Sequence, residues 1–197
     1  MQESKLKKLL EARQPFTSSD AQRHGVSYEA LGRACRAGKI QRIRYGLYSV
    51  VSDHISEYDD LKLASKLIPY SVVCLFSALA FHELTTQVPY QIWLAIPQGR
   101  RRKKSKQLDI HYVSLSPDVF DYGIETHNAD GVEIKVYSVA KTVADCFKFR
   151  NKIGLDVALE ALRDAIAKRR ATREDIYAAA KICRVSKIIL PYMESIS

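Results

Sequence analysis

Apolar positions in the first quarter of the chain recur at helical spacing. A leucine stripe predicts a first helix near the N-terminus: Leu6, Leu9 and Leu10. Hydroxyl side chains then indicate where further helices begin, because serine and threonine cap free backbone N–H groups. We expect a short helix after residues 17–19 that ends near His24, and a second helix over 28–37 that Ser27 caps.

After the second helix the pattern changes to the alternation of strands. Gly38 is typical of the residue that follows a helix C-terminus. Residues 39–44 and 47–51 alternate around Tyr45 and Gly46, as in a β-hairpin. Helix, turn, helix and hairpin in this order predict a winged helix-turn-helix, in which the second helix enters the DNA major groove.

The remaining pattern predicts a larger mixed domain. A polar, acidic stretch interrupts the basic trend, so we expect a winged helix-turn-helix domain over 1–52, a linker over 53–59 and an α+β domain over 60–197. The predicted fold class is therefore α+β, with antiparallel strands followed by a helical segment in the C-terminal domain. Strands are expected at 90–96, 108–115, 123–128 and 132–137, the last two joined by an Asp-Gly turn.

Helices account for most of the rest. A capping box of Thr172 and Asp175 marks the start of one of them, and either Ser71 or Ser77 is expected to cap another. The predicted helices are 60–67, 77–84, 138–150, 155–169, 173–183 and a stretch over 188–193 interrupted by Pro191.

Charge is concentrated where the DNA-binding pattern lies. The chain has 197 residues and a formal net charge of +9, and residues 1–51 hold ten Lys/Arg against four Asp/Glu. About two-thirds of the excess thus lies in the first quarter of the chain. A compact basic module favours a nucleic-acid partner, although a solvated basic face would have the same composition.

Cysteine usage and hydropathy exclude several classes of protein. The four cysteines are scattered without a C-x-x-C pair, so we expect small buried hydrophobic residues in a reducing compartment and no zinc site. The charge-free stretch 68–82 is shorter than the roughly 20 residues of a membrane helix. A cytoplasmic protein without membrane contact is expected.

A second basic segment lies between two predicted strands. Six cations fall within residues 98–106, and so many like charges predict an exposed, mobile loop. Such a loop could contact a polyanion, either phosphates, RNA or an acidic protein, or could be a solvated connection. The six residues are Arg100, Arg101, Arg102, Lys103, Lys104 and Lys106.

No arrangement of residues makes a convincing active site. Glu133 and Lys135, with Asp118 or Asp121, have the residue types of a metal-dependent nuclease, but Glu-x-Lys is also typical of an exposed strand. Three histidines lie in separate predicted elements, without an evident acidic partner, and structural roles are expected for them: His82, His111 and His127. We therefore expect no catalytic residue, no metal and no cofactor.

Two segments of the body carry a family resemblance. Residues 73–87 (VCLFSALAFHELTTQ) with 92–97, and residues 136–147 (VYSVAKTVADCF) with 149–154, resemble the body of AbiEi-like antitoxins. The ending of the predicted hairpin, Arg44-Tyr45-Gly46-Leu47-Tyr48, resembles the Arg-x-Gly-x-Tyr ending of the winged helix-turn-helix in that family.

The resemblance implies two activities. Members of the family repress their own operon by binding promoter repeats, and they counter a toxin with a nucleotidyltransferase fold without forming a stable complex, which defines a type IV toxin–antitoxin system. The C-terminal domain carries the antitoxin activity and helps two copies bind DNA together. A copy without a neighbouring toxin gene would be a stand-alone transcriptional regulator.

By the same resemblance, 28–37 is the recognition helix and 40–51 is the wing. Arg33 and Arg36 are expected to contact base edges, because guanidinium groups pair well with guanine in the major groove. Phosphate, backbone or minor-groove contacts are expected from Thr17, Ser18, Ser19, Ser27, Tyr28, Lys39, Arg42, Arg44 and Tyr45.

Overall fold

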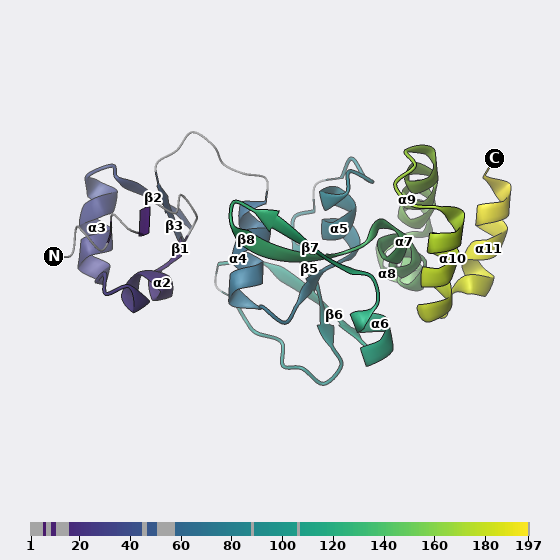
Figure 1. Cartoon of the computed structure of the whole chain (residues 1–197), viewed down its shortest axis with the longest axis horizontal. Helices are drawn as coiled ribbons and strands as arrows, with labels where there is room; N and C mark the ends of the chain where they lie inside the picture. The colour runs from purple at the N-terminus through teal and green to yellow at the C-terminus, as the bar shows by residue number, and fades with distance from the viewer. Residues whose placement is uncertain are drawn as a thin grey trace.

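A computed structural model describes residues 6, 9–10, 16–44, 47–50, 58–87, 89–105 and 107–196. Its strands form two sheets, a three-stranded sheet near the N-terminus and a five-stranded sheet in the rest of the chain. Figure 1 shows the N-terminal elements at one end of the molecule and the last helices at the other. Within the described ranges, none of the helices combines the length and apolarity that crossing a membrane requires.

The N-terminal module, residues 16–50 with Leu6, Leu9 and Leu10, has the predicted order of elements. Its strands pair antiparallel in the order β1-β3-β2. Thr17 and Ser27 cap the two helices, as predicted. The elements are β1 (Phe16–Thr17), α2 (Ser18–Arg23), α3 (Tyr28–Arg36), β2 (Ile40–Arg44) and β3 (Leu47–Val50).

A small apolar core holds the module together. Phe16 stacks on Tyr48 of β3 with ring centroids 5.9 Å apart, and Leu9 and Leu10 pack against the edge of this core. The fully enclosed members are Leu6, Phe16, Ala21, Val26, Ala30, Leu31, Ala34 and Ile40. Because both helices contribute their apolar sides to this core, their polar sides face outward.

The body, residues 58–196, has the predicted α+β class but a mixed sheet. Its strand order is β6-β5-β4-β8-β7. The pairs β4–β5 and β7–β8 are antiparallel, whereas β5–β6 and β4–β8 are parallel, which corrects the expectation of antiparallel strands alone. The elements of the sheet region are α4 (Asp59–Leu67), β4 (Val72–Val73), α5 (Leu75–Phe81), β5 (Ile92–Pro97), β6 (Ile110–Leu115), α6 (Pro117–Asp121), β7 (Ile124–Ala129) and β8 (Val132–Tyr137).

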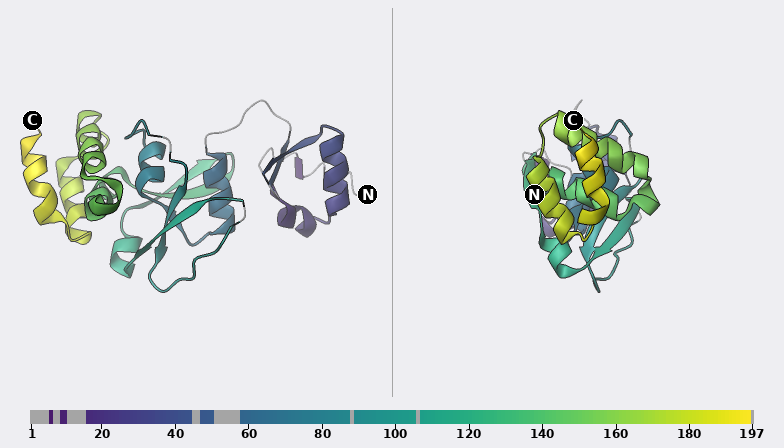
Figure 2. Two further views of the ribbon diagram at one scale, coloured as in Figure 1. Left: turned by 180° about the vertical axis from the view of Figure 1, so that it is seen from behind. Right: turned by 90° about the vertical axis from the view of Figure 1, so that its right-hand side faces the viewer.

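Five further helices follow the sheet. Ser138 caps the first of them, and Thr172 and Asp175 form the predicted capping box. The helices are α7 (Val139–Lys148), α8 (Arg150–Ile153), α9 (Leu155–Ala167), α10 (Arg173–Ile182) and α11 (Ser186–Ser195). The views from behind and along the molecule show the last helices gathered beyond the sheet, at the C-terminal end (Figure 2).

Alternating side chains of the sheet enter two different cores. In β4, Val72 packs with the C-terminal helices and Val73 packs with α4, because successive side chains of a strand point to opposite faces. Leu94 and Ala95 of β5 divide in the same way. The sheet is therefore covered on both faces.

The predicted start of α5 is wrong. The helix begins after Cys74 without a side-chain cap. Ser71 donates its hydroxyl to the Ile68 carbonyl at 2.8 Å, and the Ser77 hydroxyl accepts from the Trp93 N–H at 2.9 Å. Ser71 thus closes a local turn and Ser77 binds β5, while β4, which no local signal predicts, occupies residues before the helix.

A buried lysine ties α4 to the far hairpin. Lys62 is 2% exposed and lies 2.6 Å from Asp59 and 2.7 Å from Asp130 in the β7–β8 turn. Burial alone would lower the pKa of Lys62, but the hydrogen bonds to Asp130 and Asp59 outweigh it and raise the pKa. The predicted linker, 53–59, falls largely outside the described residues, and the domain boundaries stay a prediction.

Candidate nucleic-acid interface

The position of α3 follows from its buried side. Ser27 accepts a hydrogen bond from the Ala30 N–H at 3.3 Å and fixes the start of the helix. Ala30, Leu31 and Ala34 are enclosed in the core of the module. These three side chains set the rotation of α3, and the opposite face is therefore directed to solvent.

The exposed face of α3 carries an aromatic ring and two guanidinium groups. Tyr28 is 58% exposed, and Arg33 and Arg36 are exposed one turn apart. Neither arginine forms an ion pair with a carboxylate in the part of the chain that the structure describes. Unpaired guanidinium groups on an exposed helix can donate to base edges or to phosphates.

Gly32 lies between these side chains on the same face. A Cβ atom added at Gly32 would meet nothing within 4 Å, so packing inside the chain does not require glycine there. Glycine in a helix interior costs about 1 kcal/mol relative to alanine. The missing side chain leaves the helix backbone accessible at this point of the exposed face.

The start of α2 is built around Asp20. The Thr17 hydroxyl and N–H both donate to Asp20 Oδ2, at 2.8 and 2.9 Å, and Asp20 also pairs with Arg23. Burial raises the pKa of Asp20, but the hydrogen bonds from Thr17 and the nearby cations Lys66 and Arg23 produce a net decrease. Thr17 is buried and bound within the chain, which argues against the expected phosphate contact from its side chain.

Strands β2 and β3 of the module form the antiparallel hairpin that was predicted as the wing. Arg42 is exposed and pairs with Tyr48 across the two strands, and an irregularity between Arg42 and Arg44 shifts the register. The structure describes the backbone of Arg44, while Tyr45 lies outside the described residues. Ser18 and Ser19 at the start of α2, Ser27 before α3 and Lys39 after it are at least partly accessible.

The second basic segment is exposed, but its backbone is held in place. Arg100 through Lys104 are all exposed, whereas Lys106 lies outside the described residues. The Tyr70 hydroxyl donates to the Arg101 carbonyl at 3.0 Å, and the Tyr112 hydroxyl donates to the Lys103 carbonyl at 2.6 Å. These bonds connect the loop to two residues of other segments. Charge alone could not reveal them, because the two tyrosines are distant in sequence.

The residues considered for catalysis lie apart or serve the fold. Glu133, Lys135, Asp118 and Asp121 are exposed. Across the described ranges, no three His, Cys, Asp or Glu side chains lie close enough to hold a metal ion. The structure thus brings together no nuclease centre from these residues.

Two of the histidines lie close together, although His82 follows α5 and His127 lies in β7. The rings of His82 and His127 have centroids 6.4 Å apart beside an open cavity of about 680 Å³. Burial lowers the pKa of His82, and its Nε2 is 2.7 Å from the Tyr137 carbonyl, so the neutral ring donates there. His127 Nε2 lies 3.4 Å from Glu125 Oε2, which corrects the expectation that it has no acidic neighbour.

The third histidine stacks on the only tryptophan of the chain. The rings of His111 and Trp93 have centroids 3.9 Å apart. The pKa of His111 is lowered by burial and by the positive charges of Lys152 and Arg102. His111 therefore contributes to packing on β5 and β6.

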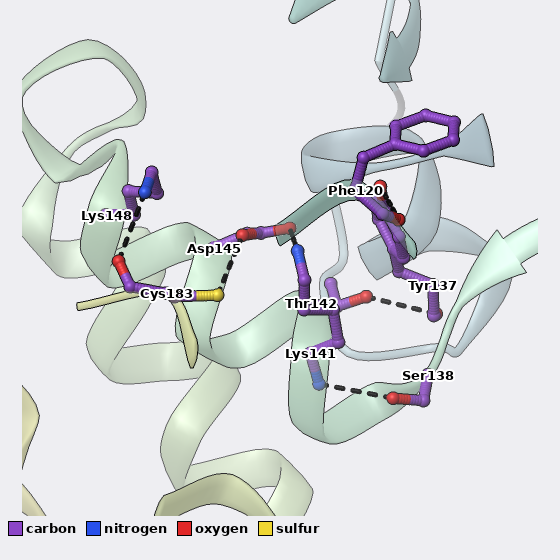
Figure 3. A network of polar contacts seen from close by, with 8 residues as sticks. All are labelled: Phe120, Tyr137, Ser138, Lys141, Thr142, Asp145, Lys148 and Cys183. Atoms are coloured by element: carbon purple, nitrogen blue, oxygen red, sulfur yellow. Dashed lines mark hydrogen bonds and ion pairs between the residues drawn. The ribbon is translucent and has the colours of Figure 1, made fainter. Parts of the chain in front are cut away.

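A buried polar network fixes α7 against the sheet (Figure 3). Lys141 Nζ lies 2.5 Å from Asp145 Oδ2 and 4.0 Å from the centroid of the Tyr137 ring. Asp145 Oδ1 accepts from the Cys183 thiol of α10 at 3.3 Å. Burial raises the pKa of the Asp145 carboxyl and, to about 12, that of Cys183, so this thiol stays protonated. The network is inaccessible and joins α7 to α10 rather than forming an active site.

Comparisons with known proteins concern both the N-terminal module and the whole fold. Residues 4–51 match the family described as "Transcriptional regulator, AbiEi antitoxin", which confirms the AbiEi-like resemblance in the N-terminal quarter. A comparison with curated proteins gave no match. The match favours a transcriptional-regulator role for these residues.

The whole fold has a counterpart among solved structures. The Rv2827c protein from Mycobacterium tuberculosis has a similar fold with a TM-score of 0.58, over 98% of this chain and 82% of that protein. The two sequences are only 10% identical, so the similarity concerns the fold alone. It confirms that the module and the α+β body occur together in a known architecture.

Proposed function

We propose that the chain is a DNA-binding transcriptional autorepressor and the antitoxin of a type IV, AbiE-like toxin–antitoxin system. The observation that carries the proposal is the exposed face of α3, with Tyr28, Arg33 and Arg36 on a module that matches AbiEi regulators. The partner is double-stranded DNA with repeats at the promoter of its own operon, in the cytoplasm. The toxin has a nucleotidyltransferase fold and does not form a stable complex.

In this proposal α3 enters the major groove and the wing lies beside it. Arg33 and Arg36 donate to base edges, while phosphates are held by residues around the helix. The α2 start contributes through Ser18 and Ser19 rather than through the buried Thr17 side chain. The remaining phosphate or minor-groove contacts come from Ser27, Tyr28, Lys39, Arg42, Arg44 and Tyr45.

Binding to the DNA upstream of the chain's own gene tests the first half of the proposal. Arg33→Ala/Arg36→Ala is expected to abolish the preference for this DNA over a scrambled duplex, at about 1–3 kcal/mol for each bidentate contact. Arg163→Ala/Lys187→Ala removes two exposed cations of the body as the matched control. Unchanged specificity in the Arg33/Arg36 variant, with normal circular dichroism, contradicts the role of α3.

Co-expression with the neighbouring gene tests the second half. If that gene encodes a nucleotidyltransferase-like toxin, the intact chain is expected to restore growth, and the Arg33/Arg36 variant should still do so because repression and antitoxin activity are separate. If the intact chain does not restore growth of cells that express the toxin, the antitoxin role is contradicted. DNA binding without such a neighbour supports the stand-alone regulator instead.

A further inference from the structure

The open cavity beside His82 and His127 is formed by segments that are distant in the sequence. These segments are the end of α5, strand β7, the start of α7 and the connection from α9 to α10. Its volume of about 680 Å³ lies within the range of small-molecule sites, about 300–1,000 Å³. We call it the α7 cavity, and its polar groups come from His82, Glu125, Val139, Ala140, Arg170 and Asp175.

The first turn of α7 brings two N–H groups without an acceptor to this cavity. The first N–H groups of any helix have no partner inside the helix. Here the Ser138 N–H donates to the Gly123 carbonyl at 2.7 Å, and the Lys141 N–H donates to the Ser138 hydroxyl at 3.3 Å. No described residue accepts from the N–H groups of Val139 and Ala140, which both line the cavity. These two donors, at the positive end of the helix dipole, can bind an anion.

His82 joins this helix start to a guanidinium group. Its Nε2 donates to the Tyr137 carbonyl at 2.7 Å, directly before the residue that caps α7, and its own carbonyl accepts from Arg170 at 3.2 Å. Arg170 is exposed, lies 4.0 Å from a Glu83 carboxylate oxygen, and forms no shorter ion pair with the described residues. The remaining N–H groups of its guanidinium can therefore bind an anion near the start of α7.

The same cavity also offers acceptors. His82 is only 7% exposed, and burial lowers its pKa, so the ring is neutral near pH 7. Because the proton is on Nε2, the Nδ1 atom is an acceptor, and it has no hydrogen-bond partner among the described residues. Of the two carboxylates in the lining, Asp175 already accepts from the N–H and the hydroxyl of Thr172. Nδ1 of His82 and the exposed Glu125 are thus the acceptors left for a ligand.

We propose that the α7 cavity binds a small organic anion, a phosphate ester or carboxylate that also carries a hydroxyl or amine group. Arg170 and the N–H groups of Val139 and Ala140 hold the anionic group. The hydroxyl or amine donates to His82 Nδ1 or to Glu125. This inference concerns the body alone and does not rest on the proposed function.

A small molecule fits this cavity better than a polymer or a metal ion. Val139 and Ala140, which supply the two N–H donors, are each 9% exposed, so a compound must enter the cavity to reach them. A nucleic-acid backbone that lies on the surface makes no such contact. In the part of the chain that the structure describes, no three His, Cys, Asp or Glu side chains are close enough to hold a metal ion.

Calorimetric titration of the full chain with three anions tests the inference. Ribose 5-phosphate or malate is expected to bind at a single site with a Kd of about 1 mM or lower. Inorganic phosphate, which has no separate hydroxyl-bearing part, is expected to bind about tenfold more weakly. Whichever organic anion binds more tightly identifies the preferred anionic group. If neither binds, or if inorganic phosphate binds equally well, the inference is overturned.

Neighbouring arginines provide a matched pair of variants. Arg170→Gln removes the guanidinium from the cavity and is expected to lower the affinity for the organic anion about ten- to hundredfold, because hydrogen bonds between charged groups are strong. Arg169→Gln removes the same charge from the adjacent exposed residue, which does not line the cavity. Its affinity is expected to equal that of the unmodified chain. Equal affinities of the two variants contradict the assigned site.

Nitrogen NMR of the imidazole rings locates the bound anion without any substitution. The organic anion is expected to shift the Nδ1 signal of His82, because this atom gains a donor. His111, which stacks on Trp93 and does not line the cavity, serves as the internal control. Binding that leaves the His82 signal in place, or that duplex DNA abolishes by competition, shows that the inference is wrong.

Val139→Pro tests the contribution of the helix start. Proline is favoured at the first position of a helix, and Ser138, with a ψ of 158°, has a conformation suited to the residue before proline. The substitution removes one N–H group and no charge, so affinity for the organic anion is expected to fall about two- to tenfold. Full affinity in the folded variant, as judged by circular dichroism, overturns the role of this N–H group.

Discussion

In the module, Arg33 and Arg36 lie exposed on α3 without a carboxylate partner in the described residues, whereas in the body Lys62 and Lys141 are buried and paired with aspartates. Arg33 and Arg36 thus leave their charges on the surface of the module, whereas Arg23 is paired with Asp20. The body uses these two cations to join its own elements, α4 to the β7–β8 turn and the turns within α7. Charge therefore serves internal structure in the body, whereas the proposed role of Arg33 and Arg36 is to contact a partner outside the chain.

The basic strap is the part of the body that departs from this rule. In this strap, residues 100–104, the cations are exposed as in the module, but the Tyr70 and Tyr112 hydroxyls bind two of its backbone carbonyls and Lys103 Nζ donates to the Leu67 carbonyl of α4. The difference from Lys62 and Lys141 is burial, because a buried ammonium requires a counter-ion while an exposed one does not. Exposure without a carboxylate partner among the described residues is thus what the strap shares with Arg33 and Arg36 of α3.

Breaking the buried pair is expected to have the largest effect. Lys141→Met leaves the Asp145 carboxyl buried without its ion pair and should lower the free energy of unfolding of the body by about 3–5 kcal/mol. Trp93, the only tryptophan, reports this transition by its fluorescence in denaturant. Operator binding by Lys141→Met should survive under conditions where the body remains folded, because the substitution lies outside the module and its core.

The double variant Lys141→Met/Asp145→Leu separates the pair from its packing. It removes both charges and should recover most of the lost stability, since apolar groups can replace a buried ion pair. A single variant that costs less than about 1 kcal/mol, far below the usual 3–5, would falsify the structural role of the pair.

The capping boxes allow a sharper comparison, because each region contains one. Asp20→Asn in the module and Asp175→Asn in the body should each lower the stability of their own region by about 1 kcal/mol at neutral pH. The pKa of Asp20 is lowered by folding, so its contribution is present above the unfolded pKa of about 3.9 and is lost as the pH falls through the folded pKa.

Unfolding of the module, followed by circular dichroism between pH 6 and pH 2, tests this dependence. The stability difference between the unmodified chain and Asp20→Asn is expected to shrink below about pH 4. A difference that stays constant over the whole range contradicts the assigned role of the Asp20 charge.

Glycines of the module give the smallest effects, with opposite signs. Gly32→Ala should raise the stability of the module by up to about 1 kcal/mol, because nothing surrounds the added methyl group. Gly38→Ala also meets open space, but Gly38 has a φ of +66°, so the substitution should destabilise by about 1 kcal/mol. Melting curves of both variants check the signs.

Gly32→Ala should also weaken binding to the operator, because the added methyl group keeps a partner further from the helix backbone at this point. Gly38→Ala should leave affinity unchanged at temperatures where it is folded. Unchanged operator affinity in Gly32→Ala means that the partner does not approach α3 at this point.

Local signals in the sequence predicted the elements that local chemistry controls. Ser27, Ser138 and the Thr172–Asp175 box marked helix starts correctly, since a cap needs only neighbouring residues. Strand β4 was missed because two residues in a parallel pair with β8 have no local signature. The predicted contacts of Arg33, Arg36 and the basic strap with nucleic acid remain predictions.

The order of helices and hairpin, the basic N-terminal quarter and the cluster of cations at 100–106 were already determined by the sequence, because periodicity, capping and charge act over a few residues. The tertiary structure alone decided which cations are exposed and which are paired. It placed Asp130 beside Lys62, Cys183 beside Asp145, and Tyr70 and Tyr112 against the strap. Those contacts join residues far apart along the chain, so they exist only once packing has brought them together.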